Sequence, residues 1–267
     1  MNIKVLCVGI NHYLGISKLT SCINDAKDWQ QLFHKDLQVP KNNITRLSFG
    51  PKTNASTIKK ELRKLVKSLG KGDLGVFIFS GHGNQKFTTT NGLPTIKEGI
   101  RARDKSIYEN ELRTITNKIN PEAYFVSIVD ACYSGGVDFK ELILKNLERK
   151  NQNLEIKSYA NKILKENLIA KENYRKLLKP LNKNFITLSA CKPNELAYGD
   201  LFIRDQNARM NGVLTYYTIG YIKDNPQITY AELIKKLQNI LPDQSKGHDQ
   251  TPQLNGHKNI INNTVFK

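Results

Sequence analysis

The sequence predicts an α/β protein with a mostly parallel β-sheet and helices on both of its faces. Short apolar segments rich in β-branched residues alternate along the chain with longer segments of helical periodicity. Most of the strand segments are apolar at nearly every position, which is typical of strands covered on both faces. The 267 residues, 39% hydrophobic and 24% charged, have the composition of a folded protein with a sizeable core.

The first half of the chain begins this alternation. Residues 3–10 are apolar and β-branched, and residues 44–49 alternate apolar and polar side chains before a Gly-Pro pair, so both segments are predicted strands. Residues 21–33 place apolar side chains at helical spacing. A second helix begins after Thr53 or Asn54, either of which can cap it. The apolar positions of this second helix are Ile58, Leu62, Leu65, Val66 and Leu69.

The second half of the chain repeats this alternation of strand and helix segments. Parallel strands joined through helices require right-handed crossovers. The predicted strands are residues 74–79, 124–129 and 185–188, and the predicted helices are residues 108–119, 212–223 and 229–241.

Polar residues follow two of these strands, at the edge of the sheet where α/β proteins gather their reacting groups. One strand ends at the SGHG segment of residues 80–83, and the next ends at the DACYSGG segment of residues 130–136. A thiol attacks only as its thiolate, so Cys132 needs a base, and His82 can be that base. The glycines leave room for a peptide and leave the amide of Gly83 to bind an oxyanion.

These two segments lie about fifty residues apart, each after a strand, and they resemble the His and Cys motifs of the caspase-like cysteine peptidases. The LTSCINDA segment resembles the metacaspase sequence after the first strand. The resemblance implies a caspase-like fold with a six-stranded sheet, five strands of which are parallel, between helices. The further matching segments are residues 19–26, 188–191, 195–198, 212–215 and 250–254.

The same resemblance implies the catalytic roles. Cys132 is expected to attack the peptide bond and form a thioester, and His82 to protonate the leaving amine and then activate water. The backbone amides of Gly83 and Cys132 are expected to hold the oxyanion.

An acidic pocket is expected beside these groups, because metacaspases accept Arg or Lys before the scissile bond. The resemblance assigns this substrate pocket to Cys22, Asp25, Ser80 and Asp130. Two carboxylates next to the nucleophile would attract a guanidinium or ammonium group strongly once water leaves. Caspases that recognise Asp carry Gln where this chain has Asp130. In the alternative, Asp25 steadies a helix and Asp130 satisfies loop amides.

The resemblance also implies one caspase-like peptidase domain over residues 1–267. The segment between Cys132 and the fifth strand departs from the family, and the helical spacing of its apolar residues predicts a helical insertion there. The insertion holds eleven basic and five acidic residues between positions 140 and 179, so it carries +6 of the net +17. We expect it to limit activity until it is cleaved or displaced, as in a zymogen; an ordinary helical hairpin is the alternative. The parts are a large-subunit-like segment at 1–139, the basic linker at 140–181 and a small-subunit-like segment at 182–267.

No cofactor or metal is expected. Many metacaspases need calcium, yet Glu98 is the only acidic residue between positions 84 and 103. A calcium site needs six to eight oxygen ligands with several carboxylates.

The net charge of +17 first suggests an anionic partner. Only 9 of the 41 basic residues are Arg, and no basic motif is interleaved with aromatic residues, so no specific nucleic acid is expected.

No apolar run approaches the length of a membrane span, and no cysteine pair suggests a disulfide or zinc site. The expected location is the cytoplasm, and the expected partners are protein substrates with exposed Arg or Lys and an upstream activator. The alternatives are a caspase-fold peptidase with another preference and a catalytically inactive basic scaffold or nucleic-acid-binding protein.

Overall fold

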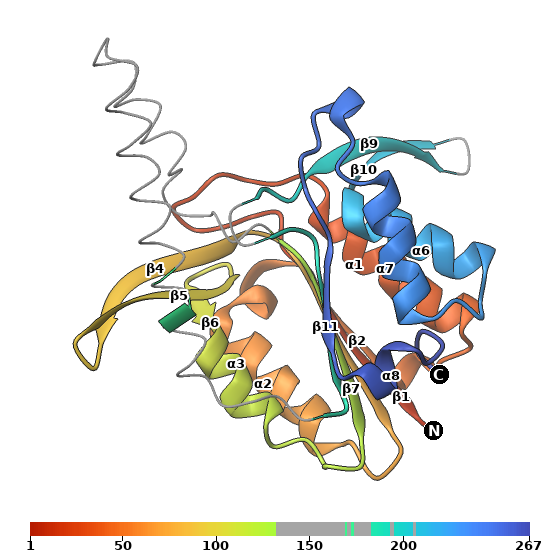
Figure 1. Ribbon diagram of the computed structural model, residues 1–267, viewed down its shortest axis with the longest axis horizontal. Coiled ribbons are helices and arrows are strands. Elements are labelled where there is room, and N and C mark those ends of the chain that lie inside the picture. The colour runs from red at the N-terminus through yellow and green to blue at the C-terminus, as the bar shows by residue number, and fades with distance from the viewer. Residues whose placement is uncertain (132–168, 170–171, 174–182, 193–194, 205–206) are drawn as a thin grey trace.

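A computed structural model of the chain describes residues 1–131, 169, 172–173, 183–192, 195–204 and 207–267. Its centre is a six-stranded sheet in the order β11-β8-β7-β3-β1-β2 (Figure 1), in which β11 alone runs antiparallel to its neighbour. The predicted caspase-like α/β architecture is therefore confirmed. The strands are β1 (Ile3–Gly9), β2 (Ile44–Leu47), β3 (Leu74–Ser80), β7 (Tyr124–Asp130), β8 (Phe185–Ser189) and β11 (Gln253–Gly256).

Helices cover both faces of this sheet, which explains why its inner strands β1, β3 and β7 are apolar at almost every position (Figure 1). In β1, Val5 and Cys7 belong to the core under α1, α6 and α7, whereas Leu6 and Val8 belong to the core under α2 and α3. The helices are α1 (Cys22–Gln31), extended by a π-helical turn (Leu32–Asp36), α2 (Ala55–Lys67), α3 (Glu109–Thr116), α6 (Val213–Asp224), α7 (Tyr230–Ile240) and α8 (Lys258–Ile261). Short 3-10 turns are Lys41–Asn43, Gly50–Thr53 and Gln244–Lys246.

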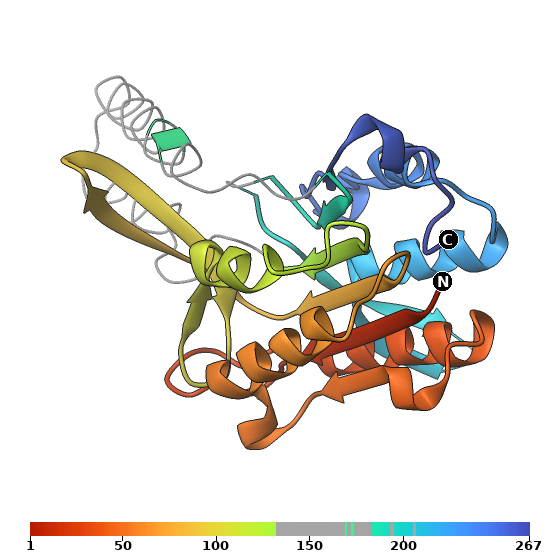
Figure 2. The same ribbon diagram turned by 90° about the horizontal axis from the view of Figure 1, so that it is seen from below.

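Two small sheets were not predicted. One has the strands β4 (Gly83–Thr90), β5 (Leu93–Arg101) and β6 (Ser106–Tyr108), and the β4–β5 hairpin projects from the body of the molecule (yellow in Figure 2). The other is the hairpin of β9 (Gly199–Arg204) and β10 (Asn207–Gly212). The strands β4 and β10 are mostly polar, and β5 and β9 hold only short or scattered apolar residues, so both hairpins lack the apolar pattern of the central strands. The Asn-Gly pair at positions 91 and 92, where both residues have positive φ, was the available hairpin signal.

The helices predicted at 108–119, 212–223 and 229–241 correspond to α3, α6 and α7. The predicted helical insertion at 140–181 lies almost entirely outside the described residues. Among the helices that the structure describes, none is both long and apolar enough to cross a lipid bilayer.

Candidate active site

The register of the central sheet brings the predicted site residues to one edge. Gly9 of β1 is paired with Ser80 of β3, and Ser80 is paired with Asp130 of β7. Just beyond, the backbone N–H of Gly81 donates to the carbonyl oxygen of Asp130 at 3.2 Å. The segment that carries His82 is therefore hydrogen-bonded to the segment that leads to Cys132, which itself lies outside the described residues.

His82 is held by the loop that follows β1. Its backbone N–H donates to the hydroxyl of Tyr13 at 2.8 Å, and its Nε2 lies 3.0 Å from the carbonyl oxygen of Ser17. Because a carbonyl only accepts, this contact requires the hydrogen on Nε2 and leaves the lone pair on Nδ1. Gly81 allows the close packing, since a Cβ there would lie 2.8 Å from Cζ of Phe79 and closer still to the Tyr13 hydroxyl.

Neither Tyr13 nor Ser17 was identified from sequence. The available signal was the polar run after the first strand, but nothing local indicates that this loop folds over His82, which lies 65 residues beyond Ser17.

The amide of Gly83, the predicted oxyanion donor, lies at the start of β4. The N–H of Arg101 donates to the carbonyl oxygen of His82 at 2.8 Å, one residue outside the pair formed by Gly83 and Ile100. In an antiparallel ladder this makes Gly83 and Ile100 a non-hydrogen-bonded pair. The Gly83 N–H consequently points away from β5.

Asp25 of α1 is completely buried, and both of its carboxylate oxygens accept hydrogen bonds. Its Oδ2 accepts from the hydroxyl of Ser80 at 2.6 Å. Its Oδ1 accepts from the side-chain amide of Asn211 at 2.9 Å and from the backbone N–H of Gly212 at 2.8 Å. Asp25 thus joins β3 to the end of the β9–β10 hairpin.

Asp130, which is 5% exposed, is bound by the first turn of α6. Its Oδ2 accepts from the backbone N–H of Thr215 at 2.9 Å and from the Thr215 hydroxyl at 2.7 Å. A helix N-terminus favours a negative charge at this place. Gly212 separates the two acids: a Cβ there would lie 2.8 Å from Oδ2 of Asp25 and 2.9 Å from Cγ of Asp130. The two carboxylates therefore face each other across a glycine.

Burial makes both of these acids hard to ionise. Burial, reinforced by the charge of Asp130, raises the pKa of Asp25 to about 8 against the opposing hydrogen bonds. Burial raises the pKa of Asp130 to about 6, although its bonds from Thr215 favour the ionised form. Near neutral pH the pair therefore holds most of one shared proton, which a cation beside the two groups would displace.

Cys22, the remaining residue of the predicted pocket, is buried beside this pair. Burial and then the charge of Asp25 raise the pKa of its thiol to about 12, so the neutral thiol is the form present at neutral pH. The structure therefore brings Cys22, Asp25, Ser80 and Asp130 together, and it adds Asn211, Gly212 and Thr215 as their partners.

No group of three or more His, Cys, Asp and Glu side chains within the described ranges has the arrangement of a metal site. The absence of a calcium requirement stays a prediction.

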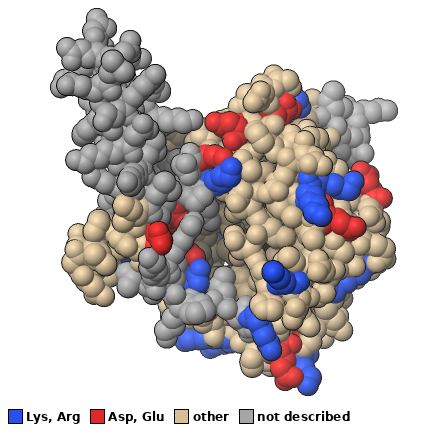
Figure 3. Space-filling view, viewed as in Figure 1, with Lys and Arg blue, Asp and Glu red and all other residues tan. Residues whose placement is uncertain are grey.

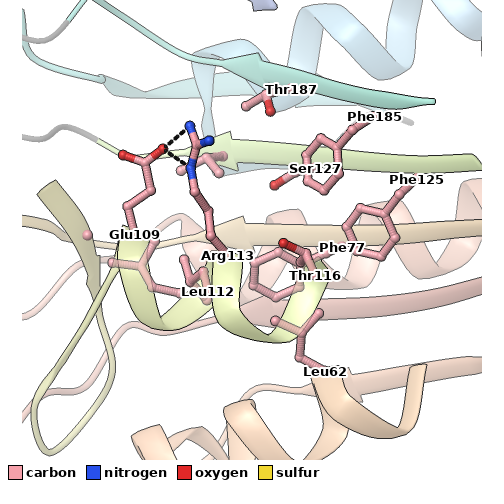
Figure 4. A pocket seen from close by; sticks show the side chains of 13 residues that line it. Leu62, Phe77, Glu109, Leu112, Arg113, Thr116, Phe125, Ser127, Phe185 and Thr187 are labelled. Atoms are coloured by element: carbon pink, nitrogen blue, oxygen red, sulfur yellow. Dashed lines mark hydrogen bonds and ion pairs between the residues drawn. The ribbon is translucent and has the colours of Figure 1, made fainter. Parts of the chain in front are cut away.

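An apolar cavity lies elsewhere, between α2, α3 and the central sheet (Figure 4). Arg113 bonds to Glu109 there through Nε at 2.9 Å and Nη2 at 2.7 Å, while Phe77, Phe125 and Phe185 form aromatic walls. None of the predicted site residues lines this cavity.

The comparisons with known proteins agree with this architecture. A family model described as the caspase domain matches residues 3–261. This chain belongs to the caspase domain family. This chain is 24% identical to Metacaspase-1A of Aspergillus oryzae over 288 residues, which cover 94% of this chain and 67% of that protein. The chain spans about two thirds of the length of this relative and of Metacaspase-1 from Cryptococcus neoformans. The prediction of a caspase-like cysteine peptidase is thereby confirmed.

Two solved structures resemble the fold of this caspase domain. A Geobacter sulfurreducens protein has a TM-score of 0.67 at 20% identity, with 100% of this chain and 99% of that one covered. Caspase-1 from Spodoptera frugiperda has a TM-score of 0.56 at 10% identity, with 96% and 86% covered. At these identities the two structures support the fold alone.

Proposed function

We propose that this caspase domain is a cysteine endopeptidase that cuts proteins after Arg or Lys, with Cys132 as nucleophile and His82 as its acid–base partner. The observation that carries the proposal is the hydrogen bond from Gly81 N–H to Asp130 O. His82 follows one of these residues directly, and Cys132 comes two residues after the other. The same sheet edge holds the buried carboxylates of Asp25 and Asp130, which supports the basic preference.

The reaction follows from the state of the imidazole. His82 Nδ1 takes the thiol proton of Cys132, and the sulfur attacks the scissile carbonyl carbon while the carbonyl electrons move to oxygen. The amides of Gly83 and Cys132 hold this oxyanion. The C–N bond breaks as the imidazolium gives its proton to the leaving amine, which leaves a thioester. Water then attacks the thioester and gives its proton to Nδ1, and the sulfur leaves and regains a proton.

The Ser17 carbonyl supports this role by positioning the ring. Its contact with Nε2 fixes the tautomer in which Nδ1 is the base, and it stabilises the imidazolium through the same hydrogen bond. Ser17 therefore acts on the reaction through His82.

The preference for a basic side chain rests on charge. Two unit charges 4 Å apart attract by about 1 kcal/mol in water but by about 4 kcal/mol at the dielectric constant near a protein surface. A guanidinium or ammonium group beside Asp25 and Asp130 would also offset their mutual repulsion, which contributes to the raised pKa of Asp25. Binding a basic side chain is therefore favoured over binding a neutral or acidic one.

A matched pair of aspartate variants tests the pocket. Asp130→Asn keeps an oxygen that can accept from Thr215 but removes the charge, so we expect cleavage of Arg and Lys reporter peptides to be abolished with the fold retained. Asp73→Asn is the control, because Asp73 lies at the opposite end of β3 and bonds to the backbone N–H groups of Asn2 and Gly70. Unchanged activity of Asp130→Asn would refute the pocket, and preferential cleavage of neutral or acidic reporters by the wild type would favour another specificity.

Thiol labelling tests the enzyme against an inactive scaffold. A chloromethyl ketone of a basic peptide should modify Cys132 selectively, since the described cysteines, Cys7, Cys22 and Cys191, are all buried. Mass spectrometry of the wild type and of Cys132→Ala identifies the labelled residue. Labelling of no cysteine would favour the scaffold. Among the described residues on the face drawn in Figure 3, Lys and Arg lie in separate groups with acidic residues among them, and they form no continuous basic patch for nucleic acid.

The basic linker at 140–181 is proposed to restrain the enzyme until it is cut, with an upstream activator as the trigger and a cytoplasmic location. Gel patterns of the wild type and Cys132→Ala, incubated alike, show whether any cleavage in the linker is made by the enzyme itself. Cuts after Lys145, Arg149, Lys150 or Lys157 are expected in the wild type alone.

A further inference from the structure

A third acid adjoins the proposed pocket. Asp28 follows Asp25 by one turn of α1 and is also buried, with 4% of the residue exposed. One atom connects the two acids: Nδ2 of Asn211 donates to Oδ1 of Asp25 at 2.9 Å and to Oδ2 of Asp28 at 3.0 Å. Asp28 therefore belongs to the same polar network as the proposed pocket, although the family motif did not indicate it.

A cation of the chain itself already lies on this network. Arg209 of β10 forms an ion pair with Oδ2 of Asp28 through Nη2, an atom that is buried. Its Nε donates to Oδ1 of Asn211 at 3.2 Å. Arg209 and Asn211 are two positions apart in one strand, so their side chains leave β10 on the same face. The hairpin thus presents a guanidinium and an amide to the acids together.

Among the described residues of this network, carboxyl groups outnumber cations. Asp25, Asp28 and Asp130 are three buried carboxyl groups, and the ion pair of Asp28 places one guanidinium among them. Buried charges are screened much less by salt than exposed charges are. A basic substrate side chain would be the second cation in the network, so it would be repelled by Arg209 while it is attracted by Asp25 and Asp130.

We propose that Arg209, held by Asp28, is an internal counter-ion of the pocket that lowers its affinity for Arg and Lys side chains. This inference rests on the proposed function. It makes the β9–β10 hairpin, rather than the pocket acids alone, the element that sets the affinity for basic peptides.

The first experiment compares two ion-paired arginines of similar exposure. Arg209→Gln removes the positive charge but keeps a side chain that can bond to Asp28, and we expect the KM for Arg and Lys reporters to fall about five-fold, with a smaller change in kcat. Arg113→Gln is the control, because Arg113 is 21% exposed against 26% for Arg209 and its partner Glu109 lies away from the pocket. Arg209→Lys, which keeps the charge, should resemble the wild type.

The second experiment measures binding without turnover and detects a merely structural effect. Butylguanidine is the probe, with neutral butylurea as its control, and its Kd is measured by titration calorimetry on each folded variant. Asp28→Asn should weaken binding of the probe, because it frees Arg209 to pair with the other acids. The double variant Asp28→Asn with Arg209→Gln should restore binding, since a neutral pair then replaces the ion pair.

The outcomes distinguish a failure of the proposed function from a failure of the role of Arg209. A wild type that binds no butylguanidine and cuts no basic reporter would contradict the proposed function. If the wild type binds butylguanidine and cuts basic reporters, two results would overturn the role of Arg209 alone. One is an affinity of Arg209→Gln for butylguanidine that equals or falls below that of the wild type. The other is a double variant that binds no better than Asp28→Asn.

Discussion

Replacing Gly212 by Ala tests whether the two buried carboxylates meet as described. The φ of −63° and ψ of 135° at Gly212 suit alanine, so the substitution introduces no backbone strain. The new Cβ would instead lie 2.8 Å from Oδ2 of Asp25 and 2.9 Å from Cγ of Asp130, distances that require the acids to move. Overpacking costs about 1–3 kcal/mol, and leaving the Gly212 N–H, which donates to Asp25 at 2.8 Å, buried without its acceptor costs about 1–3 kcal/mol. We expect about 3 kcal/mol of destabilisation.

Urea unfolding followed by circular dichroism measures this difference. Gly220→Ala is the matched control, because Gly220 lies inside α6 and a Cβ there would meet nothing within 4 Å. This control should be stabilised by about 0.5–1 kcal/mol, since alanine is the better helix former. If Gly212→Ala unfolds within about 0.5 kcal/mol of the wild type while Gly220→Ala behaves as expected, the close approach of the carboxylates is refuted.

Three further predictions concern pH, positioning and metal. The pKa of Asp25 is about 8 in the folded chain and about 4 in the unfolded chain, so between these pH values the folded chain binds more protons than the unfolded chain does. The free energy of unfolding should therefore fall as pH rises from 5 to 8, by at most about 1.4 kcal/mol per pH unit for one proton. The slope should be shallower in Asp25→Asn. Tyr13→Phe removes the acceptor of the His82 N–H, so kcat for a basic reporter should fall about three- to ten-fold at constant KM, whereas an unchanged kcat would contradict this positioning. EDTA should leave turnover unchanged, and a need for millimolar calcium would show that prediction to be wrong.

The central strands could be predicted because burial on both faces leaves a local signature. β1, β3 and β7 are apolar at almost every position, and the helices between them repeat apolar residues at helical spacing. The strands β4 and β5 and the β9–β10 hairpin carry no such signature, because they lie outside the central sheet and pair with each other. Only the turn chemistry of the Asn-Gly pair could have indicated one of them.

In the candidate site, too, only the residues that belong to a local sequence pattern could be predicted. Asp25 and Asp130 were indicated by short motifs after predicted strands and in the first helix. Asn211 is 186 positions from Asp25, so no local pattern relates the two residues. The ion pair of Arg209 with Asp28 was missed for the same reason, since a basic residue in a chain with 41 of them attracts no notice.

The sequence by itself determined which residues follow the central strands, and therefore that His82, Asp130 and the cysteine motif belong to one edge of a parallel sheet. Only the tertiary structure decided what covers those residues. The β9–β10 hairpin and the first turn of α6 bury the carboxylates and supply their hydrogen bonds. Burial removes water from an ionised group, so the charge state and the partners of each acid depend on packing between distant segments, which no local sequence pattern encodes.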